Sequence, residues 1–292
     1  MFAILGILVV LGAIGGGYFM EGGNFKVLIQ PAELIIIGGS AFGTLLIANP
    51  LSVLISMMKG LVAVFLPSRY SKAFYLENLK LLNDVFAYAR KNGLVKLETD
   101  VEEPDKSQLF GKYPKFVKDH HARDFVCDTL RMAISGGVNP FDLDQMMELD
   151  MEVHHHEASV PSTALTTVAD SLPGLGIVAA VLGVVITMGA LGGPPEEIGH
   201  KVAAALVGTF LGILLCYGFF GPLASSIVKT NEAEGQYYYF LRVGLISFIK
   251  GSPPILAVEY ARRTIPARIR PSFKEMEAAC KGGGVAAAAS VG

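Results

Sequence analysis

Residues 171–195 read SLPGLGIVAAVLGVVITMGALGGPP and contain no charged side chain. At about 1.5 Å per residue, a helix of this length crosses the roughly 30 Å hydrocarbon core of a bilayer. Three further runs are also free of charge: 2–20, 34–58 and 202–228. None of the four shows the alternation of polar and apolar residues that marks barrel strands. We therefore expect an all-α protein with four membrane-spanning helices.

The composition of the whole chain agrees with a membrane protein. Charged residues make up 17% of the 292 residues, against about 25% in a typical soluble protein. The first run is preceded by no Lys or Arg, which predicts a retained span rather than a cleaved signal peptide. The net charge of −2 gives no indication of a nucleic-acid partner, and none is expected.

The distribution of basic residues predicts the orientation in the membrane. Residues 59–170 hold 13 of the 24 Lys and Arg residues and the tail from Lys229 holds 9, whereas Lys26 and Lys201 are alone near the two short loops. Because basic segments stay on the cytoplasmic side, the long middle segment and the tail are expected inside the cell. Both termini are then cytoplasmic, and the protein is expected to cross its membrane several times.

Four regions follow from this plan. Residues 1–58 hold the first two spans, 59–170 form a helical cytoplasmic domain, 171–228 hold the last two spans, and 229–292 form a helical tail. Within the domain, helices are predicted over 71–92, closed by Gly93, over about 115–134, and from Asn139-Pro140 toward Pro161. The tail is expected to break at Pro253-Pro254 and to be disordered from Lys281 onward, where it is rich in Gly and Ala.

The sequence shows no arrangement typical of an enzyme. A nucleophile triad, a phosphate loop and paired catalytic carboxylates are all missing, and the Cys and His spacings do not fit zinc. His154, His155 and His156 are consecutive, so on a helix they point about 100° apart and are poorly placed to share a metal. We expect no metal, no cofactor and no catalytic activity.

The uncharged runs lack the titratable group that ion transport needs. The last two runs offer hydroxyl groups, among them Thr209 and Tyr217. If the chain conducts ions, the carboxylate must come from another chain. The alternative is a membrane scaffold that conducts nothing.

Pro173 and Pro222 lie in the last two runs, away from the Pro194-Pro195 pair at the connecting loop. Pro222 is deep enough to kink a helix and free a backbone carbonyl. Pro173 has two possible roles: it kinks a helix, or it starts one that Asp170 caps.

Several segments, taken together, resemble the MotA family of flagellar stator subunits. Those similar to its last two spans are 169–183, 208–212 and 221–224, and those similar to its cytoplasmic parts are 89–94 with Glu98, and 254–263. The resemblance covers nearly the whole chain. It implies a ring of subunits, a homopentamer around a MotB dimer, in which MotB supplies the intramembrane acid and the anchor to peptidoglycan.

The resemblance also implies roles for individual residues. Arg90 and Glu98 would meet opposite charges on FliG of the rotor. Asp170, Pro173, Ala180, Thr209, Tyr217 and Pro222 would belong to the ion pathway or to the conformational change that protonation drives. Sodium-driven relatives carry Thr at the position of Ala180, so the coupling ion is expected to be the proton rather than sodium. The alternative within the same superfamily is an ExbB/TolQ-type energiser of another envelope machine.

Overall fold

The computed structural model describes residues 2–189 and 192–282, and every regular element in these ranges is a helix. The residues form two compact units, and each unit draws on two parts of the chain. Of the described residues, the membrane unit comprises 2–67, 157–189 and 192–231, and the globular unit comprises 68–156 and 232–282. The all-α fold predicted from the sequence is confirmed.

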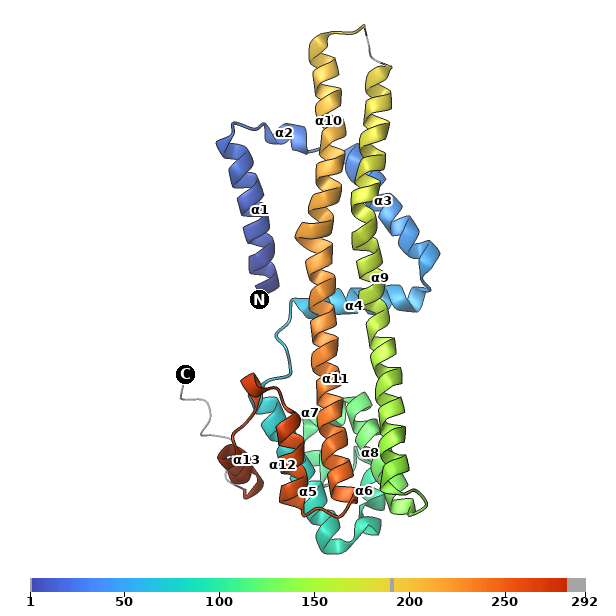
Figure 1. Cartoon of the computed structure of the whole chain (residues 1–292), viewed down its shortest axis with the longest axis vertical. Helices are drawn as coiled ribbons and strands as arrows, with labels where there is room; N and C mark the ends of the chain where they lie inside the picture. Colours follow the sequence, from blue (N-terminus) through green and yellow to red (C-terminus); the bar gives the residue numbers. More distant parts are fainter. Residues whose placement is uncertain (1, 190–191, 283–292) are drawn as a thin grey trace. The chain divides into compact units, whose positions relative to one another are not determined.

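The membrane unit holds the long apolar helices (Figure 1). Its elements are α1 (Phe2–Met20), α2 (Phe25–Leu28), α3 (Pro31–Ala48), α4 (Leu51–Val64), the later part of α9 (Pro140–Met188), α10 (Pro195–Leu214), the π-helix η3 (Leu215–Phe220) and the start of α11 (Gly221–Ile249). Among the described residues, four helical segments are long and apolar enough to cross a membrane, as predicted. No residue of α1 is buried within the chain, which leaves this helix for lipid or a partner to cover.

The second predicted span, 34–58, is wrong as a single helix. Helix α3 ends at Ala48, and α4 begins at Leu51 as a separate element. Pro50 causes the break, because it lacks a backbone N–H and forces Asn49 into extended backbone with ψ 142°. At the other end α3 begins at Pro31, so Glu33 lies inside the helix.

Helix α9 is also longer than predicted. It runs without interruption from Pro140 to Met188 and contains both Pro161 and Pro173. The interpretation of Pro173 as the first residue of a helix capped by Asp170 is therefore wrong. Each proline leaves one carbonyl without its helical donor, and the packing of α9 against its neighbours outweighs that loss.

The last span contains a π-helical turn just before Pro222. The N–H of Gly221 bonds to the carbonyl of Cys216, five residues back, at the end of η3. This turn absorbs the interruption that Pro222 causes, and α11 then continues to Ile249. The predicted span 202–228 is thus the middle of a helical stretch that begins at Pro195.

The globular unit is built from shorter helices. They are α5 (Lys72–Asn92), η1 (Leu94–Leu97), α6 (Glu98–Glu102), η2 (Phe110–Lys112), α7 (Pro114–Lys118), α8 (His120–Ser135), α12 (Pro254–Thr264), η4 (Ala267–Ile269) and α13 (Phe273–Cys280), with parts of α9 and α11. Gly93 ends α5 with φ 87°, as predicted. At the other end the helix begins one residue later than predicted, because Ser71 is its N-cap. Asn139 accepts from the N–H groups of Phe141 and Asp142 at the start of α9, which confirms the predicted cap.

Of two further predictions for this unit, the first is wrong as a single helix and the second is confirmed. The stretch 115–134 is divided between α7 and α8, because Asp119 between them is not helical. The break at Pro253-Pro254 is confirmed, since α11 ends at Ile249 and α12 starts at Pro254. Of the tail expected to be disordered from Lys281, residues 283–292 lie outside the described residues.

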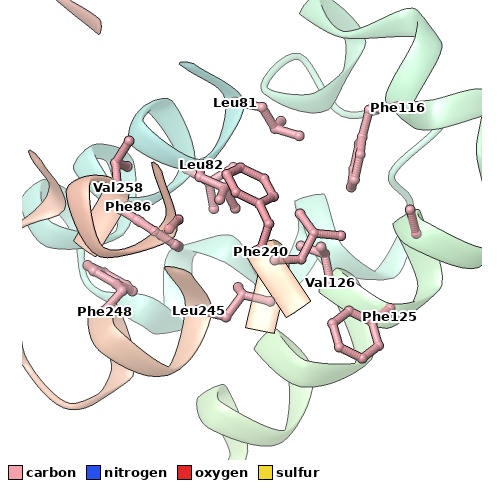
Figure 2. Close-up of a cluster of buried hydrophobic side chains, with 14 of the residues drawn as sticks. Leu81, Leu82, Phe86, Phe116, Phe125, Val126, Phe240, Leu245, Phe248 and Val258 are labelled. Atoms are coloured by element: carbon pink, nitrogen blue, oxygen red, sulfur yellow. The ribbon is translucent and has the colours of Figure 1, made fainter. Parts of the chain in front are cut away.

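A large apolar core holds the globular unit together (Figure 2). Leu82 and Phe86 of α5 meet Phe240 and Leu245 of α11 and Val258 of α12 in this core. The rings of Phe86 and Phe248 stack with their centroids 4.4 Å apart. This core fixes α5, whose last turn carries Arg90.

Candidate functional site

Helices α9 and α10 touch through glycines at the centre of the membrane unit. A Cβ atom added to Gly176 would lie 2.8 Å from the carbonyl oxygen of Gly208 and 3.1 Å from Cα of Gly212. One added to Gly212 would lie 2.5 Å from the carbonyl oxygen of Leu172. These backbone atoms cannot move aside as a side chain can, so the close approach requires glycine at each position.

This contact brings together three of the predicted pathway residues. Pro173 follows Leu172, which touches Gly212. The backbone nitrogen of Ala180 lies 3.2 Å from the point that a Cβ of Gly208 would occupy, and Thr209 is the next residue. Pro173, Ala180 and Thr209 are all half-buried. Pro173 and Ala180 on α9 and Thr209 on α10 are therefore at, or one residue from, the residues of one helix–helix contact.

The other predicted pathway residues are not enclosed by the chain itself. Asp170 and Pro222 are exposed, and 73% of the surface of Tyr217 is accessible. Large apolar side chains of α9 and α10 are exposed beside them, including Ile177, Val181 and Ile213. Within a membrane, such a face is completed by lipid or by other chains.

Arg90 and Glu98 lie in the globular unit. Arg90 is in the last turn of α5, Glu98 is the first residue of α6, and η1 connects the two helices. Both side chains are exposed, and neither forms an ion pair with any described residue. The neighbouring Glu102 differs, because Arg131 Nε lies 2.7 Å from its Oε1. The two predicted rotor-contacting charges are thus available to a partner.

The buried charges of the globular unit are paired. Glu259 accepts from Nε and Nη2 of Arg262, at 2.6 and 2.8 Å, and from Nε of Arg263. The hydrogen bonds from Arg262 lower the pKa of Glu259 from its ordinary value; burial opposes this effect, and Arg263 adds to it. Within the basic tail, Arg262 therefore has a structural role.

Sequence reasoning missed Glu33. It was placed outside the second span, because that span was expected to begin at the first uncharged residue. Instead α3 begins at Pro31, and Glu33 is buried with 6% of its surface accessible. The signal that could have found it is Pro31, since proline favours the first turn of a helix.

Family models match most of the chain. The motility protein A N-terminal model covers residues 4–93, and the MotA/TolQ/ExbB proton channel family model covers residues 117–238.

Curated relatives extend over nearly the whole length. Motility protein A of Escherichia coli K12 is 43% identical, over 95% of this chain and 94% of that protein. Chemotaxis protein LafT of Vibrio parahaemolyticus is 37% identical, over 94% and 96% respectively.

Solved structures share the fold. The C. jejuni MotAB structure has a TM-score of 0.76 at 18% identity and covers 92% of this chain and 98% of its own. The MotAB stator complex of Bacillus subtilis has a TM-score of 0.74 at 22% identity, with 91% and 96% covered. With these matches in fold and sequence, the chain belongs to the motility protein A (MotA) family.

Proposed function

We propose that this chain is a flagellar motor stator subunit that forms a proton channel with MotB and converts proton flow into torque on the rotor. One observation carries the proposal: the glycine-packed pair α9 and α10 brings Pro173, Ala180 and Thr209 together, and neither residues 171–188 of α9 nor residues 202–214 of α10 include a carboxylate. A proton path along this face needs an acid from a partner, and MotB is the partner named in the structures that share this fold.

The energy available per proton fits a switch of this kind. One charge that falls through 100 mV releases about 2.3 kcal/mol. That amount biases the equilibrium between two arrangements of a helix contact, but it does not break a large interface. Pro173 supplies the weak point, because the carbonyl of Ala169 has no helical N–H to accept from.

The globular unit is proposed to transmit torque to the rotor. Arg90 and Glu98 are exposed charges on a rigid core, and they would meet opposite charges on FliG. Exposed pairs give fast, weak contacts, as a repeated stepping motion requires. The functional assembly is a homopentamer around a MotB dimer in the inner membrane, with both termini in the cytoplasm and no catalytic role.

Cell rotation tests the proposal. Cells that lack their own stators receive this chain with its cognate MotB and are tethered in sodium-free buffer. Rotation there supports stator function and proton coupling, in line with Ala180. Rotation only after sodium is added would keep the stator and overturn the proton assignment. No rotation in either buffer, with both proteins in the membrane and a matched rotor, would contradict the proposed function.

A further inference from the structure

Glu33 is a buried acid within the membrane unit. It lies in the first turn of α3, and 6% of its surface is accessible. Its Oε2 atom is buried and has no hydrogen-bond partner among the described residues. An ionised carboxylate in that position would be strongly disfavoured, so the group needs a bound proton or a changing partner.

Gly208 makes room for this carboxyl group. A Cβ atom at position 208 would lie 2.6 Å from Oε2 of Glu33, and 3.2 Å from both Cβ of Ala179 and the backbone nitrogen of Ala180. Because Gly208 on α10 has no side chain, the carboxyl group of Glu33 on α3 lies against the contact between α9 and α10. Thr209 follows directly on α10, so Glu33 borders the pathway that the proposed function describes.

Helices α2 and α3 both contact α10, and the ribbons of α3 and α10 can be followed in Figure 1. A polar cleft lies at the start of α3 and of α10. The cleft has a volume of about 540 Å³, and Gln30 and Ala204 are among its lining residues. Ala204 precedes Gly208 by four residues, so the two share one face of α10. Gln30 is the residue just before α3, three positions before Glu33. The cleft thus opens about one helical turn from the carboxyl group.

The charges around Glu33 lie on the cleft side. Helix α3 has no other titratable residue, and α9 has none between residues 171 and 188. Helix α2 carries Lys26, and the first turns of α10 carry Glu196, Glu197, His200 and Lys201. Lys201 pairs with Glu197 over 2.9 Å. Glu196, Glu197 and His200 of the cleft are exposed, whereas Glu33 is buried.

We propose that Glu33 is a proton-loading site, which takes a proton from water in the cleft and passes it on to the acid that MotB supplies. This inference rests on the proposed function. In the first step hydronium gives its proton to the carboxylate, which forms the O–H bond on Oε2 and leaves water. In the second step that O–H bond breaks, and the proton goes to the partner carboxylate. No electron is transferred.

The test measures rotation at near-zero load in the assembled stator, at several external pH values. Glu33→Gln keeps the size of the side chain but cannot carry a proton in transit. Glu21→Gln makes the same change at an exposed acid before α2 and is the matched control. Because protons are scarce at high pH, we expect Glu33→Gln to lower the speed on the order of tenfold at about pH 8, and less at about pH 6. Glu33→Asp is expected to restore part of the speed.

The outcomes distinguish the proton-loading role of Glu33 from the stator function. If Glu33→Gln rotates like the unmodified chain at every pH, the proton-loading role is wrong while the stator function stands. If the loss is the same at every pH, Glu33 is only structural, and the inference is also wrong. Failure of the unmodified chain to rotate would contradict the proposed function itself.

A second variant covers the case in which Glu33→Gln does not accumulate in the membrane. Gly208→Ala keeps the acid but displaces its carboxyl group. Because the added methyl group also presses on Ala179 and Ala180, part of the speed loss is expected at every pH, and the loss should be larger at high than at low pH. A double variant Gly208→Ala with Glu33→Gln should show no further pH dependence beyond that of Glu33→Gln, and a ratio of speeds for Gly208→Ala and the unmodified chain that does not change with pH would overturn the proposal.

Discussion

Tyr237 on α11 donates a hydrogen bond to Oδ1 of Asn78 on α5 over 2.7 Å, although the two residues are 159 positions apart. Both residues are buried. The amide of Asn78 in turn donates to the carbonyl of Phe74 over 2.9 Å. This chain of bonds ties the tail to the helix that carries Arg90.

Removal of the Tyr237 hydroxyl should weaken the globular unit. Tyr237→Phe leaves Oδ1 of Asn78 buried without its donor, which costs about 1–3 kcal/mol. The midpoint of urea unfolding of the detergent-solubilised chain, followed by limited proteolysis, measures the loss. Tyr239→Phe on the same helix is the control, because that residue is exposed. Equal midpoints for the two variants would show that the buried hydrogen bond contributes nothing.

Acid should destabilise the tail through Glu259 and Glu275. Hydrogen bonds lower the pKa of Glu259, chiefly from Arg262, and the pKa of Glu275 to about 2, chiefly from Lys72. A lowered pKa in the folded state stabilises the protein above the unfolded value of 4.5 and ceases to do so as the pH falls toward the folded value. The melting temperature is therefore expected to fall from about pH 4.5 to about pH 2.

The variant Glu259→Gln tests whether Glu259 contributes more than Glu275 to the loss of stability in acid. Its side chain is 11% exposed, whereas Lys72, the partner of Glu275, is 47% exposed and screened by water. We expect Glu259→Gln to lower stability by about 2 kcal/mol at neutral pH and to flatten the acid dependence. Glu277→Gln, at an exposed pair with Lys281, is the control. A variant as stable and as acid-sensitive as the unmodified chain would contradict this assignment.

The sequence was informative where local chemistry decides the structure. Gly93, Asn139 and Pro254 each mark a helix end or start through a backbone property that does not depend on distant residues. The presence of four spans followed from apolar length alone. These features could be predicted with no knowledge of the packing.

The sequence was less informative where packing overrides local preference. Pro161 and Pro173 would end an isolated helix, yet both lie inside α9. The burial of Glu33 depends on the missing side chain of Gly208, which lies 175 residues away. The hypothesis that Arg90 and Glu98 contact the rotor rests on the family resemblance. The structure adds that both side chains are exposed.

The glycine contact between α9 and α10 should be intolerant of larger residues. Gly212→Val would place Cβ 2.5 Å from the carbonyl oxygen of Leu172 and 2.9 Å from Cα of Gly176, so the helices must separate. Rotation should be lost, and less MotB should copurify. Gly174→Ala is the control, because a Cβ there meets nothing within 4 Å. Rotation of the Gly212→Val variant at normal speed would show that close packing is not required.

Reversal of the charge at Arg90 should reduce torque without unfolding the chain. Arg90 has no ion-pair partner among the described residues, so Arg90→Glu breaks no internal contact. Stall torque of tethered cells should fall, and an opposite charge change on FliG should restore part of it. Lys91→Glu makes the same reversal one residue away and should have a smaller effect. If no rotor variant restores Arg90→Glu, the assigned contact is wrong.

Pro173→Ala should abolish rotation while the chain still inserts. Alanine restores an N–H that can bond to the carbonyl of Ala169, and this stiffens α9 beside the glycine contact with α10. Alanine is far more favourable than proline inside a helix, so the melting temperature should stay the same or rise. Pro161→Ala in the same helix is the matched control, and it should keep its rotation because Pro161 lies more than three turns before Pro173. Tethered-cell speed and membrane levels are measured for both variants. Normal rotation of Pro173→Ala would mean that the interrupted backbone of α9 takes no part in coupling, and loss in both variants would locate the requirement in the whole helix rather than at Pro173.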